Sequence, residues 1–165
     1  MYSPKWSKAK RTLKGFICEP LKDRVDFHII NYRKAPDQLG RAVITVDNKE
    51  ILSMCTIKSN MRRYQKENEI IQQQNNFENI DKKAHEHIKI QGIYAQYDFF
   101  DALEQYFNAP IEKSLKSTDM VIKILCLIDR RVGKRTLYNL RETIEKENDI
   151  IKFFYQLRCD AEGVR

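Results

Sequence analysis

The fold is decided at residues 41–57, which read RAVITVDNKEILSMCTI. Two runs rich in β-branched residues, 42–46 and 51–57, flank the Asp-Asn-Lys triplet at 47–49, whose residue types favour a tight turn. This pattern predicts a β-hairpin. Upstream, residues 24–33 alternate apolar and polar side chains, as a strand does when it buries one face. Together the three runs predict a three-stranded antiparallel sheet.

Helices are predicted before and after these strands along the chain. Ser3 followed by Pro4 is a typical helix start, and Pro20 ends the first helix. After the hairpin, Ser59 is suited to cap a polar helix. The predicted order up to about residue 75 is therefore helix, strand, strand, strand, helix.

The chain has the length of one domain, 165 residues, and its 42% hydrophobic residues are enough for a core. An Asn- and Gln-rich segment near 75–80 is a candidate seam between residues 1–75 and a helical part, residues 81–165. In that part, helices are predicted at residues 81–91, 94–107, 119–131, 136–147 and 148–157. The expected fold is α+β, with an N-terminal helix and the sheet followed by an all-helical C-terminal half.

The composition predicts a cytoplasmic protein without a membrane segment or a cofactor. The basic N-terminus lacks the apolar segment of a signal peptide, and no later stretch approaches the length that spans a bilayer. His85 and His87 would diverge on a helix, so no metal site is expected there. The cysteines are far apart and form no Cys-x-x-Cys pair, which favours free, buried thiols. They are Cys18, Cys55, Cys126 and Cys159.

The net charge of +7 is concentrated in two segments. Residues 1–40 hold nine Lys or Arg against four Asp or Glu, and residues 121–140 hold five against one. Such clusters suggest an anionic partner, with nucleic acid as the leading class, although basic helices also serve solubility alone.

The order of the first five elements is that of the double-stranded RNA-binding domain, which places RNA before DNA as the expected ligand. That module contacts the duplex through its first helix, a strand-connecting loop and the start of its second helix. The second helix here lacks the module's alanine-rich face and its Lys-Lys-x-x-Lys spacing. The corresponding cations are Lys5, Lys8, Arg11, Arg33, Lys34, Lys58, Arg62 and Arg63.

A second basic candidate is the stretch at residues 129–137, which reads DRRVGKRTL and joins two predicted helices at a glycine. As a helix-turn-helix, it would direct Arg135, Tyr138 and Arg141 into a major groove, with phosphate contacts from Arg130 and Lys134. The alternative is a structural corner in which Asp129 pairs with a nearby arginine.

A metal-dependent nuclease is a weaker hypothesis. Pro36-Asp37 and Asp47-Asn48-Lys49 match the letters of the PD-(D/E)xK signature, in which carboxylates hold a divalent metal. The second acid and the lysine fall in the predicted hairpin turn instead of along a strand. The hypothesis requires Asp26, Asp37 and Asp47 to converge, and since no catalytic constellation is evident, a binding protein is expected before an enzyme.

A protein partner or a homodimer is the alternative to nucleic acid. It predicts an exposed aromatic patch, for which Tyr94, Tyr97 and Phe100 are the candidates.

Four stretches resemble a family of uncharacterised bacterial proteins, and the resemblance covers nearly the whole chain. They are YSPKW at residues 2–6, NYRKA at 31–35, the segment 129–137, and residues 154–163. The resemblance implies a bacterial, cytosolic protein and assigns no functional residue.

Overall fold

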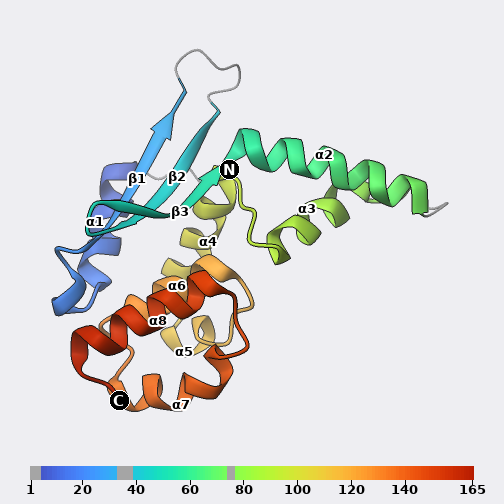
Figure 1. Ribbon diagram of the computed structural model, residues 1–165. Coiled ribbons are helices and arrows are strands. Elements are labelled where there is room, and N and C mark those ends of the chain that lie inside the picture. The colour runs from blue at the N-terminus through green and yellow to red at the C-terminus, as the bar shows by residue number, and fades with distance from the viewer. Residues whose placement is uncertain (1–4, 33–38, 74–76) are drawn as a thin grey trace. The chain divides into compact units, whose positions relative to one another are not determined.

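A computed structural model describes residues 5–32, 39–73 and 77–165 (Figure 1). Its first elements are α1 (Trp6–Phe16), a short 3₁₀ helix η1 (Glu19–Leu21), β1 (Val25–Asn31), β2 (Gly40–Val46), β3 (Lys49–Cys55) and α2 (Thr56–Gln73). The helices that follow are α3 (Ile80–Ile90), α4 (Gln96–Asn108), α5 (Ile111–Ser114), α6 (Met120–Ile128), α7 (Lys134–Ile144) and α8 (Asp149–Glu162). The predicted α+β fold, with its order of elements, is confirmed.

The sheet has the order β1-β2-β3, and its hairpin turn is one residue shorter than predicted. Asp47 and Asn48 both have positive φ angles, 51° and 64°, which is the requirement of a two-residue type I′ turn. The Arg24 guanidinium donates to both Asp47 carboxylate oxygens at 2.9 and 2.8 Å and so lowers the pKa of Asp47. Asp47 therefore adopts the turn conformation and also forms an ion pair with Arg24.

The chain forms two compact units, each assembled from segments that are distant in sequence. The first unit comprises residues 1–28, 44–52 and 100–165, and the second comprises residues 29–43 and 53–99. Each of the three strands contributes residues to both. The seam predicted near residues 75–80 overlaps residues outside the described ranges and stays a prediction.

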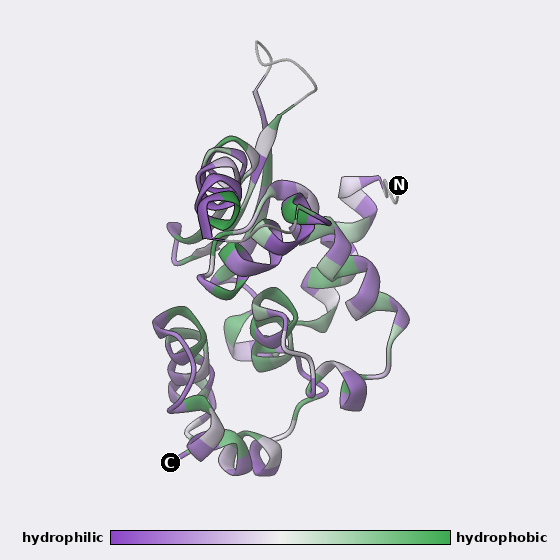
Figure 2. Ribbon diagram, turned by 90° about the vertical axis from the view of Figure 1, so that its right-hand side faces the viewer, coloured by the Kyte–Doolittle hydropathy of each residue, from purple (hydrophilic) through white to green (hydrophobic). Residues whose placement is uncertain are grey.

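The core of the first unit is built around α6, in which eight residues are buried and only Lys123 is partly exposed. Asp119 caps this helix by accepting hydrogen bonds from the backbone N–H groups of Val121 and Ile122. Helix α8 packs against α6, α7 and η1. The hydroxyl of Tyr155 on α8 donates to the Leu137 carbonyl at 2.7 Å and ties α8 to α7. Figure 2 shows hydrophobic and hydrophilic residues on the same helices, as expected of amphipathic helices around a core.

In the second unit, α2 packs along α3 as a helical hairpin. Position 40, at the start of β2, requires glycine, because a Cβ there would lie 2.3 Å from the Ile30 carbonyl oxygen. At the start of α4, the buried Asp98 accepts a hydrogen bond from the Ala95 N–H and contacts His85, both at 2.7 Å. Gly40 thus allows β2 to approach β1 closely, and Asp98 holds the backbone at the start of α4.

Within the described ranges, no helix is both long enough and apolar enough to cross a membrane. All four cysteines are described, and each is buried and free.

Candidate nucleic-acid interface

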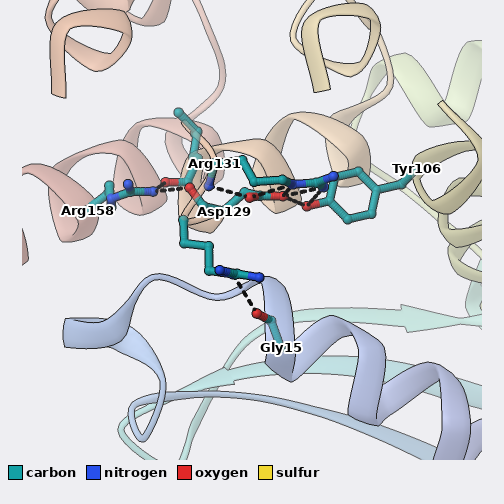
Figure 3. A network of polar contacts seen from close by, with 7 residues as sticks. Gly15, Tyr106, Asp129, Arg131 and Arg158 are labelled. Carbon is teal, nitrogen blue, oxygen red and sulfur yellow. Dashed lines mark hydrogen bonds and ion pairs between the residues drawn. The ribbon is translucent and has the colours of Figure 1, made fainter. Parts of the chain in front are cut away.

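The corner between α6 and α7, residues 129–133, is organised around a buried carboxylate. Asp129 is 1% exposed and accepts hydrogen bonds from the Arg131 guanidinium at 2.7 and 3.1 Å, from the Arg131 backbone N–H at 2.7 Å and from the Tyr106 hydroxyl. Burial raises the pKa of Tyr106 well above its usual range, and the hydrogen bond to Asp129 acts in the same direction. Figure 3 shows the three side chains converging.

A second arginine, Arg158, connects the corner to α8 through hydrogen bonds. Arg158 is 1% exposed, and its guanidinium donates to the backbone carbonyls of Leu127, Asp129 and Val132 at 2.9, 2.8 and 2.7 Å. Its Nε also forms an ion pair with Glu162 at 2.9 Å. The Leu127 carbonyl lies in the last turn of α6, where carbonyls lack a helical donor, and the Asp129 carbonyl also accepts from the Val132 N–H at 3.1 Å. Arg158 therefore supplies a donor to carbonyls at and beyond the end of α6.

The corner is also attached to the end of α1. The Arg130 backbone N–H donates to the Phe16 carbonyl at 2.7 Å, and the Arg130 Nε donates to the Gly15 carbonyl at 3.0 Å. Gly15 is labelled in Figure 3, where a dashed line reaches its carbonyl oxygen. The Arg131 guanidinium lies over the Phe16 ring, 4.0 Å from its centroid. The structural corner considered as the alternative is thus present, with Arg131 as the partner of Asp129.

The cations of α1 divide between two faces of the helix. Lys8 and Arg11 are exposed, and at about 100° per residue they share a face with Gly15, whose carbonyl binds Arg130. Lys10 and Lys14 are directed instead toward Asp26 on β1, with N–O distances of 3.2 and 3.9 Å.

On α7, Lys134 and Arg135 occupy the first turn and are exposed. This turn contains no acidic residue, and the N-cap residue Gly133 provides no side-chain cap. Further along the helix, Arg141 lies over the exposed Tyr138 ring, 5.0 Å from its centroid. The start of α7 therefore presents two exposed cations without an acidic partner in the described part of the chain, while Arg141 already contacts Tyr138.

The basic residues of α2 have a different environment. Arg62 pairs with Glu69 at 3.3 Å and Arg63 pairs with Glu67 at 3.5 Å. Lys58 is exposed. Each of the two arginines that the sequence placed on an RNA-binding surface therefore has an acidic partner within its own helix, although Glu69 also binds Lys66 at 3.1 Å.

The predicted basic residues thus fall into three groups. Those of the first unit are Lys5, Lys8, Arg11, Arg130, Lys134 and Arg135, and those of the second are Lys58, Arg62 and Arg63. Arg33 and Lys34 lie outside the described residues.

The acids required by the nuclease hypothesis have other partners where they are described. Asp26 pairs with Lys10, Asp47 pairs with Arg24, and Asp37 lies outside the described residues. In the part of the chain that the structure describes, no three His, Cys, Asp or Glu residues form a group that could hold a metal ion.

Sequence reasoning missed Tyr106 and Arg158. One signal was available for Arg158: it follows Ile151, Phe154 and Tyr155 at helical spacing, and so lies on the buried face of α8. A charged residue at such a position needs several buried acceptors, which the carbonyls of the corner provide.

The fold and the site define an α+β protein in which the corner between α6 and α7 exposes basic side chains above a buried network of hydrogen bonds. A family model describes the SF0329 protein family and matches residues 5–159, and the chain belongs to this family. The family resemblance seen in the sequence is thereby confirmed. No curated protein and no solved structure matches the chain.

Proposed function

We propose that the protein binds nucleic acid through phosphate contacts made by a basic surface on its first unit. This basic surface consists of Lys5, Lys8, Arg11, Arg130, Lys134 and Arg135. One observation carries the proposal: these six side chains are exposed and, within the described residues, have no acidic partner, whereas Arg62 and Arg63 of α2 have one each. Exposed cations without local partners are suited to neutralise phosphates.

Helix stability does not account for these cations. Both α1 and α7 lack an acid in the first turn, where α1 carries Lys8 and α7 carries Lys134 and Arg135. A cation at the positive end of the helix dipole is unfavourable, by about 0.3–1 kcal/mol at an exposed position. A bound phosphate would reverse the sign of that interaction, since helix N-termini and cations both attract anions.

The framework beneath the surface supports the proposal because it limits the motion of the cations. Arg130 joins the corner to the end of α1 through two hydrogen bonds, and Arg158 joins it to α8 through three. Cations held on an ordered backbone lose less conformational entropy when they bind.

RNA is proposed before DNA because the order α1-β1-β2-β3-α2 is that of the double-stranded RNA-binding domain. The contact assigned to the second helix is not proposed, since Arg62 and Arg63 are paired and α2 packs along α3. The corner between α6 and α7 supports a DNA ligand as the second candidate. We further propose a cytosolic and bacterial protein, and its four buried, free thiols are consistent with a reducing compartment.

The test is a fluorescence titration against double-stranded RNA, double-stranded DNA and single strands of equal length, at about 50 and 200 mM salt. The proposal expects binding that weakens steeply with salt and is tightest for one of the duplexes. Absence of binding to all three at the lower salt concentration would refute it. A parallel series with magnesium would reveal any cleavage of the strands.

A further inference from the structure

Helix α2 exposes a row of apolar side chains that its own unit does not cover. Ile57, Met61, Tyr64 and Ile71 are 37%, 61%, 56% and 44% exposed. Asn68, also exposed, completes a row with successive spacings of four, three, four and three residues. At about 100° per residue, the five side chains fall within about 80° of one another.

The face of α2 opposite the row carries the buried residues that can pack against α3. Ser59 is buried and Arg63 and Ile70 are half-buried, and these three lie about 200° from the exposed row. On α3, Ala84 and Ile88 are completely buried. Packing between α2 and α3 therefore uses one face of α2, and the four apolar side chains of the row stay at least 37% exposed within the described residues. The Arg63 guanidinium lies over the Tyr64 ring, 5.2 Å from its centroid, so this ring also contacts its own helix.

The spacing of the row is that of a coiled coil. Alternating steps of four and three residues place Ile57, Tyr64 and Ile71 at d positions of a heptad and Met61 and Asn68 at a positions. A single Asn at an a position fixes the register and the number of strands in parallel two-stranded coiled coils, at some loss of stability. A polar residue within an otherwise apolar row thus has a physical role if the row faces a copy of itself.

We propose that the exposed row of α2 binds the α2 helix of a second copy of this chain, parallel and in register, with Asn68 against Asn68. This is a surface separate from the proposed nucleic-acid interface, and the two proposals can fail independently.

The residues beside the row are compatible with pairing to an identical helix. In a parallel pair, the g positions Asn60 and Glu67 face the e positions Gln65 and Gln72 of the other copy. No like charges meet in these pairs, so self-association carries no repulsion along either flank.

The size of the contact indicates a weak dimer. The 18 residues of α2 are about 27 Å long, which is two and a half heptads. The four exposed apolar side chains would cover about 400 Å² per copy, roughly half of the 800 Å² that each partner contributes to a standard interface. A dissociation constant on the order of 10–100 μM is expected, so association must be measured at high protein concentration.

Sedimentation equilibrium at about 10 to 500 μM tests for the dimer. The wild-type chain should change from monomer to dimer over this range. Met61→Asp places a charge in the row and should raise the dissociation constant at least about tenfold. The control Gln73→Asp makes the same charge change at an exposed position on another face of α2 and should dimerise as the wild type does. A monomer at every concentration would overturn the proposal.

Disulfide cross-linking tests the geometry. Ile71→Cys introduces an exposed thiol on the row, while the four native cysteines are buried. In a parallel, in-register pair the two new thiols come within disulfide range, with Cα atoms about 4.4–6.8 Å apart. Mild oxidation should therefore give a covalent dimer with Ile71→Cys and little with Gln73→Cys. Equal cross-linking of both variants, or dimerisation without cross-linking at position 71, would contradict the parallel arrangement.

Discussion

Replacing Asp129 by Asn should destabilise the protein by about 2–4 kcal/mol. Asp129 is 1% exposed and accepts hydrogen bonds from the Arg131 guanidinium, the Arg131 backbone N–H and the Tyr106 hydroxyl. A hydrogen bond to a charged group contributes about 1.5–3 kcal/mol, and removing one partner of a buried ion pair costs about 3–5 kcal/mol. The Arg131 side chain is 34% exposed, so water compensates part of the loss, and the amide of Asn can still accept one hydrogen bond.

Urea unfolding followed by circular dichroism measures this effect. With a slope of about 2 kcal/mol/M for a chain of this size, the midpoint should fall by about 1–2 M. Asp23→Asn is the matched control, because Asp23 is exposed and has no ion pair within the described residues, and its effect should stay within about 0.5 kcal/mol. If both variants shift the midpoint equally, the buried network does not hold the corner.

Three further predictions concern single positions. Gly40→Ala should destabilise by about 1–3 kcal/mol in urea unfolding, because its Cβ would lie 2.3 Å from a backbone oxygen; Gly15→Ala, where no atom lies within 4 Å of the added Cβ, should have no such effect. Burial raises the pKa of Asp26, but the Phe27 N–H and Lys10 outweigh it and lower the pKa overall. The ionised Asp26 carboxylate therefore stabilises the fold above its unfolded pKa, and this stabilisation is lost as pH falls through its pKa in the folded protein. The Tm of the wild type should drop more steeply below about pH 4 than the Tm of Asp26→Asn, and parallel Tm curves would contradict this. Burial raises the pKa of Cys126 to about 12, so its thiol should react with a disulfide reagent only after unfolding, and rapid labelling of the native protein at Cys126 would be inconsistent with the structure.

The hairpin could be predicted because its signals are local. Asp47 and Asn48 tolerate positive φ angles, and the β-branched runs on either side fix the strands. The corner after α6 could not be predicted in the same way. Its backbone carbonyls are satisfied by Arg158, which lies 26 residues or more further along the chain, and no local pattern identifies such a partner.

Which basic side chains have an acidic partner could be predicted from the sequence only in part. The pairing of Arg63 with Glu67 has the i, i+4 spacing of a helix and could have been recognised, whereas the pairing of Arg62 with Glu69 spans seven residues. Of the three aromatic residues predicted for an exposed patch, Tyr94 is 4% exposed and Phe100 is half-buried, and only Tyr97 is exposed. Four exposed apolar side chains form a row on α2, a helix whose polar composition concealed their spacing.

The most direct test of the basic surface compares two double variants that remove the same charge. Lys134→Ala with Arg135→Ala removes cations that have no acidic partner among the described residues, and Arg62→Ala with Arg63→Ala removes paired ones. The logarithm of the binding constant for a duplex should be measured against the logarithm of the salt concentration for both. Each lost phosphate contact reduces the magnitude of the slope by about 0.9, so the first variant should lose nearly 2 and the second should match the wild type. Equal slopes for the two variants, or the larger loss in the Arg62 and Arg63 variant, would contradict the assignment of the interface to the first unit.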